Sequence, residues 1–171
     1  ENSLTFQAVK ETLEETVQRN VQDDPRLDTT TRSAVIQARR GQGKFRSNVE
    51  LVESHCRLTK ITNRTLLIAS HIKPWRSCET SDERLDGMNG LLLTPDADLL
   101  FDRGFITFED EGEVVVSPRF DARDLHRLGL GDLVMHRLGF GESQHPWRTE
   151  AFSTQQRRYL AYHRAEVYVG V

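Results

Sequence analysis

The first third of the chain has apolar residues at helical spacing. Over residues 4–21 they recur every four or five positions and predict an amphipathic helix, which ends before Pro25. A second helix is predicted over residues 32–40, and the glycines at 41–43 are expected to break it. Residues 45–53 are predicted to be helical again because their apolar side chains share one face.

The pattern changes in the middle of the chain to short apolar runs, which are typical of buried strands. Residues 66–69 form one run, which is followed closely by His71, and residues 91–93 form another. Residues 73–88 between them are polar and contain proline and glycine, so they predict a long loop. A structureless loop of this length usually has a function.

Helix start signals are clearest after the second apolar run. Thr94 suits an N-cap and Pro95 suits the first helical position, so they predict a helix over residues 95–103. Residues 105–108 and 113–117 then predict two strands, which residues 109–112 join as a hairpin.

The rest of the pattern completes an α+β organisation. Ser153 suits the N-cap of a C-terminal helix predicted over residues 153–169. We expect a helical, basic extension over residues 1–54, a core with its following hairpin over residues 55–118, and a helical extension over residues 119–171. The mixture of helices and short strands places the fold in the α+β class.

Composition narrows the function classes. The 171 residues suit one domain with an extension, and the lack of a run of about 18 apolar residues excludes a membrane helix. Cys56 and Cys78 are not part of a Cys-x-x-Cys pair, which excludes a four-cysteine zinc site. A disulfide between them stays open, but we expect free thiols in a reducing cytoplasm. The chain starts at Glu1 without a signal-peptide pattern, so we expect a fragment or a processed product.

Charge is split along the chain, although the net charge is only −3. Residues 32–76 carry ten basic and two acidic side chains, and residues 77–124 carry four basic and thirteen acidic ones. The basic half is suited to binding phosphate groups. The acidic half is suited to binding a metal ion if some of its carboxylates lie close together in the fold. The alternative is that these charges are solvated and cancel in space.

Two side chains from the middle of the chain suit phosphodiester hydrolysis. Attack by water needs a base, and it needs a cation that offsets charge on the phosphorane and the leaving oxygen. His71, at the end of a predicted strand, has a pKa near the working pH and is the candidate base. Asp98, one turn into the predicted short helix, is expected to face His71 and bind a hard cation. The alternative is a carboxylate that only stabilises the helix N-terminus.

Four motifs occur in order along the chain: Ala38–Arg46, Ala69–Trp75, Asn89–Leu93 and Leu100–Gly104. Taken together, they resemble the HNH endonuclease family, and in particular its branch found in bacterial restriction-type proteins. The resemblance covers residues 38–118 and is weaker over the tail at 156–164. The resemblance implies a ββα-metal core with N-terminal helices, an extra β-hairpin and a C-terminal helix. It also implies the nuclease domain of a larger restriction or defence protein, with a recognition domain upstream of residue 1.

The resemblance implies that His71, Asn89 and Asp98 are catalytic and that Asp98 and Asn89 hold the metal ion. Asn89 either binds the metal or ties the loop to the strand, although Asn-Gly is also an ordinary turn dipeptide. Asp98 stands where the family has its third histidine, and Ser70 stands where many members have an acid or a histidine. Such a site favours Mg²⁺, with Mn²⁺ as a substitute, and a structural zinc ion is not expected. Asp102 is a further candidate.

DNA is the expected partner, held through its phosphates by basic side chains near the core. The candidates are Arg39, Arg40, Lys44, Arg46, Lys73 and Arg76. Trp75 suits stacking at a base step, although a tryptophan after proline is more often a packing residue. Two alternatives stay open: a DNA-binding module that does not cut, and a nuclease acting on RNA or single strands. The oligomeric state is also open, a homodimer included.

Overall fold

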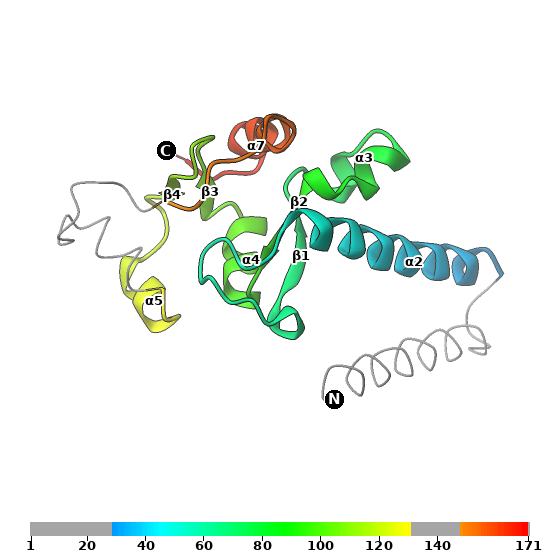
Figure 1. The fold of residues 1–171 in the computed structure, drawn as a ribbon, viewed down its shortest axis with the longest axis horizontal. Coiled ribbons are helices and arrows are strands. Elements are labelled where there is room, and N and C mark those ends of the chain that lie inside the picture. Colours follow the sequence, from blue (N-terminus) through cyan, green and yellow to red (C-terminus); the bar gives the residue numbers. More distant parts are fainter. Residues whose placement is uncertain (1–28, 131–147, 171) are drawn as a thin grey trace. The chain divides into compact units, whose positions relative to one another are not determined.

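The computed structural model describes residues 29–130 and 148–170 of the chain (Figure 1). The helix predicted over residues 4–21 lies outside the described residues. The chain divides into two compact units, residues 1–44 and residues 45–171. The second unit contains both of the described sheets.

A single helix, α2 (Thr29–Val52), runs through the glycines that the sequence predicts as a break. The prediction of separate helices over residues 32–40 and 45–53 is therefore wrong. A glycine inside a helix costs about 1 kcal/mol, whereas burying a phenylalanine or a valine side chain stabilises by about 1.5–3 kcal/mol. Phe45 and Val49 are both buried, so their packing outweighs the two glycines.

Two short strands form the sheet that carries the candidate base (Figure 1). β1 (Ile68–His71) pairs antiparallel with β2 (Gly90–Leu93), and His71 lies opposite Gly90. α4 (Pro95–Asp102) follows β2 directly and packs against both strands. The predicted order of strand, strand and short helix is confirmed, and so is the α+β class.

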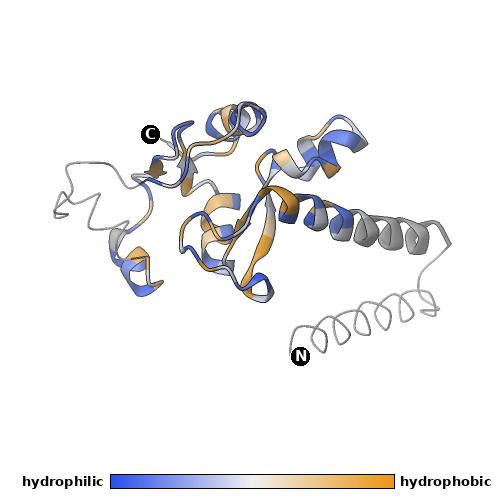
Figure 2. Ribbon diagram, in the orientation of Figure 1, coloured by the Kyte–Doolittle hydropathy of each residue, from blue (hydrophilic) through white to orange (hydrophobic). Residues whose placement is uncertain are grey.

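β2 is buried on both faces. Leu91, Leu92 and Leu93 have no exposed surface, and Figure 2 shows apolar residues along the paired strands and on α4. Gly90 allows part of this packing, because a Cβ atom there would meet the side chains of Val49 and Phe45. A larger residue at position 90 would therefore push the end of α2 away from the sheet.

The predicted second hairpin and C-terminal helix are also confirmed, and they pack together. β3 (Ile106–Phe108) pairs with β4 (Val114–Val116), and α7 (Thr154–Glu166) packs against β3. Ser153 caps α7 through a capping box with Gln156, whose side chain bonds back to the Ser153 backbone.

The long loop predicted after His71 contains short helices. They are η2 (Trp75–Ser77), α3 (Ser81–Leu85) and η3 (Gly87–Asn89), with η1 (Arg64–Leu66) before β1 and α5 (Ala122–Arg127) after the second hairpin. The prediction of a structureless loop over residues 73–88 is therefore wrong. Thr80 caps α3 by accepting from the Glu83 backbone N–H. This Thr-x-x-Glu spacing is the helix signal within the polar composition of the loop.

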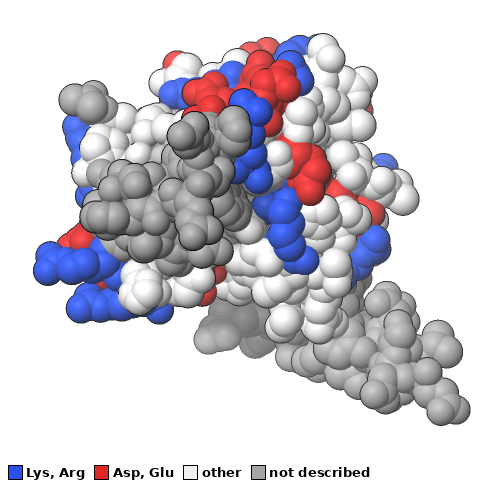
Figure 3. Space-filling model, turned by 60° about the vertical axis from the view of Figure 1, so that its left-hand side comes forward, with Lys and Arg blue, Asp and Glu red and all other residues white. Residues whose placement is uncertain are grey.

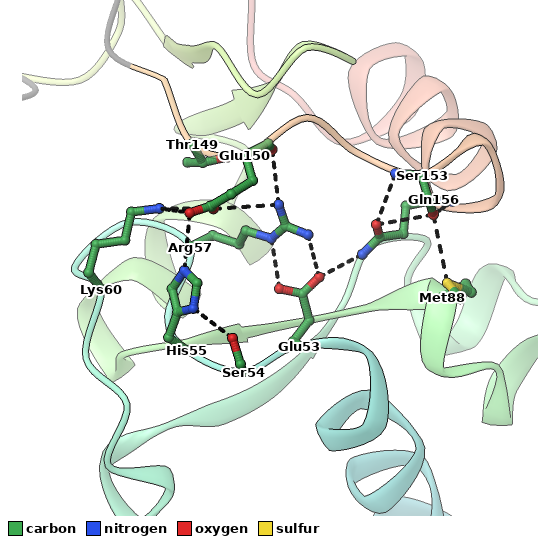
Figure 4. A network of polar contacts seen from close by, with 10 residues as sticks. All are labelled: Glu53, Ser54, His55, Arg57, Lys60, Met88, Thr149, Glu150, Ser153 and Gln156. Carbon is green, nitrogen blue, oxygen red and sulfur yellow. Dashed lines mark hydrogen bonds and ion pairs between the residues drawn. The ribbon is translucent and has the colours of Figure 1, made fainter.

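A buried ion pair joins the end of α2 to the segment around the start of α7 (Figure 4). Glu53 accepts hydrogen bonds from Arg57 at 2.7 and 2.6 Å and from Gln156 at 2.7 Å. Arg57 also donates to the Glu150 carbonyl oxygen and lies over the Phe152 ring. Because Glu53 and Arg57 are only 4% and 8% exposed, each charge depends on the other for compensation.

His163 connects α7 to the end of α4 and to β3 from a buried position. Its ring stacks on Phe101 with the centroids 3.9 Å apart, and Nε2 donates to the Phe101 carbonyl oxygen at 3.0 Å. Nδ1 lies 2.9 Å from the Thr107 hydroxyl oxygen. Burial lowers the pKa of His163 to about 4, so the ring is neutral at pH 7.

We expect the free energy of unfolding to fall as the pH is lowered from 6.5 to about 4. Over this range the unfolded chain protonates His163 and the folded chain does not, so acid favours the unfolded state. The stability lost through His163 is on the order of 3 kcal/mol over the whole window. Urea denaturation across this pH range measures the loss, with His163→Gln as the matched variant. An equal pH slope in both proteins would contradict the assignment.

Candidate active site

His71 lies at the end of β1 between two aromatic rings. Phe45 stacks on the imidazole with ring centroids 3.5 Å apart and an interplanar angle of 9°, and Trp75 contacts it edge-on at 5.6 Å. This half-buried position lowers the pKa of His71 below its ordinary value. The imidazole is therefore neutral at pH 7 and able to accept a proton.

One ring nitrogen of His71 is held by the backbone of α3. Nε2 lies 3.0 Å from the Arg84 carbonyl oxygen, and a carbonyl oxygen only accepts hydrogen bonds. Nε2 therefore carries the proton, and Nδ1 carries the lone pair. A hydrogen bond at one imidazole nitrogen sets the chemistry of the other, so Nδ1 is the basic atom of His71.

Asn89 is fully buried, and its side chain binds the loop that follows the base. Oδ1 accepts from the Lys73 backbone N–H at 2.8 Å, and Nδ2 donates to the carbonyl oxygens of Lys73 and Glu83 at 3.2 Å each. Nδ2 also lies 3.4 Å from the Cys78 sulfur. The amide oxygen is thus occupied by the backbone. These contacts fit the alternative in which Asn89 orders the loop, and its role as a metal ligand stays a prediction.

Asp98 lies in the first turn of α4 and has the Ser70 side chain as its hydrogen-bond partner. Ser70 and His71 are neighbours in β1, so their side chains point to opposite faces of the strand. Among the described contacts, Asp98 therefore meets the strand at the residue before the base, and not at His71 as the sequence predicts. Burial raises the pKa of Asp98, and the charge of Asp102 raises it further. A nearby cation would stabilise this carboxylate.

The side chains around Asp98 carry oxygen donors of the chemical kind that a hard divalent cation takes. The carboxylates of Asp98 and Asp102 are one helical turn apart, and they and the Ser70 hydroxyl are ligands of the kind that Mg²⁺ takes. The described residues contain no group of three or more His, Cys, Asp and Glu side chains that could hold a metal ion. Cys56 and Cys78 are free thiols, as predicted. Water and phosphate oxygens would therefore have to complete the coordination.

Two of the basic side chains predicted to contact DNA already have partners within the domain. Lys73 pairs with Glu83 at 2.8 Å and is largely buried. Arg46 pairs with Glu50 at 2.8 Å and donates to two backbone carbonyl oxygens near the start of β1. A phosphate group would have to displace these partners in order to bind either side chain.

The basic stretch over residues 32–76 therefore presents less free positive charge than its composition suggests. Three further basic side chains in it are paired with acids: Arg57 with Glu53, Lys60 with Glu150, and Arg64 with Glu50. Figure 3 shows basic and acidic side chains interspersed on the face that it presents. Lys44 and Arg76 are exposed. The side chains of Arg39 and Arg40 lie outside the described residues.

The sequence pattern does not reveal two of the groups that hold the base. Phe45 is expected only on the apolar face of a helix, and nothing in its spacing indicates contact with His71. Arg84 acts through its backbone carbonyl group, which has no side-chain signature. The Thr80-x-x-Glu83 spacing is the sequence signal from which α3 could have been predicted. The end of such a helix has carbonyl groups without a partner in the helix, and the Arg84 carbonyl is one of them.

The order of strand, His71, ordered loop, strand and carboxylate-bearing helix is a ββα arrangement. A family model described as HNH endonuclease matches residues 56–109. Residues 56–109 thus belong to the HNH endonuclease family, and they include His71, Asn89 and Asp98. No curated protein matches the chain. In the described part of the chain, no helix has both the length and the apolar character needed to cross a membrane.

Proposed function

We propose that the protein is a metal-dependent endonuclease that hydrolyses DNA phosphodiester bonds. The observation that carries the proposal is the geometry of His71, which lies at the end of a strand that α4 packs against. Its Nδ1 atom has no hydrogen-bond partner among the described residues. The match of residues 56–109 to HNH endonucleases supports it. By resemblance to restriction-type proteins, we further propose that this is the nuclease domain of a larger defence protein with a separate recognition domain.

In the proposed reaction, Nδ1 of His71 accepts a proton from the attacking water while Nε2 keeps its hydrogen bond to Arg84. Asn89 keeps the loop, and with it the Arg84 carbonyl group, in place. Asp98 and His71 meet β1 on opposite faces, so the phosphate would have to lie across the end of the strand. There a divalent cation held by Asp98, Mg²⁺ or Mn²⁺, would offset the negative charge on the phosphorane and the leaving oxygen. Arg76 is exposed close to the base in sequence and is suited to contact a neighbouring phosphate.

A second candidate function is a DNA-binding module of the same fold that does not cut. The incomplete set of acidic ligands favours this alternative, because Ser70 stands beside Asp98 where a second acid would strengthen metal binding. A nuclease acting on RNA or on single strands is the third candidate, because contacts to phosphate do not distinguish ribose from deoxyribose.

Cleavage of matched substrates tests these candidates. The protein is incubated with equal amounts of supercoiled plasmid, single-stranded DNA and RNA, with Mg²⁺ or Mn²⁺ and, as a control, with EDTA. Nicking of the plasmid only in the presence of metal is the expected result. Preferential loss of RNA or single strands would favour the third candidate. Binding of duplex DNA without cleavage in any metal would overturn the enzyme proposal.

Asp98→Ala is expected to weaken Mn²⁺ binding, because it removes the one half-buried carboxylate at the proposed site. Removing a residue that only hydrogen-bonds to a metal ligand lowers metal affinity roughly 10–100-fold. Removing a ligand itself should lower the affinity for Mn²⁺ at least as much. Titration of Mn²⁺ in the presence of a cleavage-resistant duplex measures the change. Asp96→Ala is the matched control, since Asp96 is exposed in the same helical turn. Equal losses in both variants would indicate a general effect of helix charge and not a ligand.

A further inference from the structure

The C-terminal end of α3 depends on side chains from other elements. The last four carbonyl groups of a helix have no partner within that helix, and α3 has only five residues. The Glu83 carbonyl oxygen accepts from Asn89 Nδ2, and the Arg84 carbonyl oxygen accepts from His71 Nε2. The candidate base is thus one of several side chains that bind a short row of helix carbonyl groups.

Asn48, on α2, binds the next carbonyl group in this row. Its Nδ2 donates to the Leu85 carbonyl oxygen at 2.6 Å, one residue beyond the carbonyl group that holds the base. The Asn48 backbone also lies so close to Gly87 that a Cβ atom at Gly87 would collide with the Asn48 carbonyl oxygen. Two adjacent contacts therefore fix the end of α3 against the last turns of α2.

The other end of α3 has a separate anchor. Glu83 pairs with Lys73 at 2.8 Å and accepts from the Glu79 backbone N–H at 2.7 Å. This anchor holds the first turn of α3 to the loop after the base. It does not reach Leu85, where the contact from Asn48 lies. Asn48 thus acts on this end together with Arg84, which donates to the Cys78 carbonyl oxygen, and Tyr159, which donates to Asp86.

We propose that Asn48 is a positioning residue for catalysis. By holding the carbonyl end of α3, it keeps the Arg84 carbonyl oxygen on His71 Nε2 and so leaves Nδ1 as the basic atom. This inference rests on the proposed function of His71 as the general base. Asn48 lies outside the matched residues 56–109, so α2 contributes to the site from beyond the family match.

Asn48→Asp tests the inference most sharply. Aspartate has nearly the same shape, but it has no N–H group to donate to the Leu85 carbonyl oxygen. We expect kcat to fall roughly 10- to 100-fold with little change in KM, which is the effect of a small displacement of a catalytic group. Leu51→Ala is the control, because Leu51 is on the same helix and 86% exposed.

The tautomer of His71 distinguishes a positioning role of Asn48 from a role in stability alone, because a change in stability would not by itself change which ring nitrogen carries the proton. In ¹⁵N NMR spectra, His71 of the natural protein is expected to be protonated on Nε2, and Asn48→Asp is expected to give a mixture of tautomers. Asn48→Ala provides the same comparison if the aspartate variant does not fold. An unchanged tautomer in the folded variant would overturn the proposal, whatever the change in rate. Because this spectrum does not require cleavage, it separates failure of this inference from failure of the proposed nuclease function.

Discussion

His71→Ala is expected to abolish metal-dependent cleavage. A general base contributes about 10²–10⁴-fold to the rate, and no other described histidine lies at the strand end beside α4. The loss should fall on kcat, because His71 is proposed to act on the attacking water and not to bind the substrate. Initial rates of plasmid nicking at saturating Mg²⁺ measure it. His126→Ala is the matched control, since His126 is exposed on α5.

The pH dependence of kcat gives a second test of the same role. The base is active when neutral, so kcat should rise with pH and level off once His71 has lost its proton. Burial lowers the pKa of His71, so the midpoint is expected below 6.5. A circular dichroism spectrum establishes that His71→Ala is folded. If the folded variant had the same kcat as the natural protein, His71 would not be the general base.

Glu53→Ala is expected to destabilise the fold by about 3–5 kcal/mol, the range for removing one partner of a buried ion pair. The substitution leaves the Arg57 guanidinium buried without its two bonds to the carboxylate, and Gln156 also loses a partner. The free energy of unfolding, measured with urea and circular dichroism, reports the change.

Two comparisons distinguish this buried pair from a surface pair. Glu111→Ala removes an exposed pair with Arg157 and should change stability by less than about 1 kcal/mol. Glu53→Leu combined with Arg57→Met removes both buried charges and should destabilise less than Glu53→Ala alone. If Glu53→Ala behaved like Glu111→Ala, the pair would not be shielded from water in the way its burial indicates.

The elements that sequence predicts best are those with local signals. The apolar runs of β1 and β2 and the Thr94-Pro95 start of α4 depend on neighbouring residues only, and all three elements are confirmed. The break expected at residues 41–43 fails because distant packing of Phe45 outweighs a local preference. The domain boundaries at residues 54 and 118 and the cytoplasmic location stay predictions.

The candidate site follows a similar division. The order of motifs and the chemistry of phosphodiester hydrolysis indicate His71 as the base, because these are properties of side chains. The groups that orient it are a backbone carbonyl and the amide of Asn48, and their contribution exists only in three dimensions. Likewise, Lys60 appears free in the sequence but pairs with Glu150, which is far away along the chain.

The burial of Asn89 also has a chemical consequence for the ageing of the protein. Asparagine followed by glycine loses its amide group readily when the glycine nitrogen can attack the side-chain carbonyl carbon. In the folded protein this attack is hindered, because Asn89 is held by three backbone groups and Gly90 is paired in β2. In the unfolded chain both restraints are lost, and deamidation would replace the Nδ2 donor by a carboxylate oxygen. Time spent unfolded would therefore leave a permanent defect in the loop that holds His71.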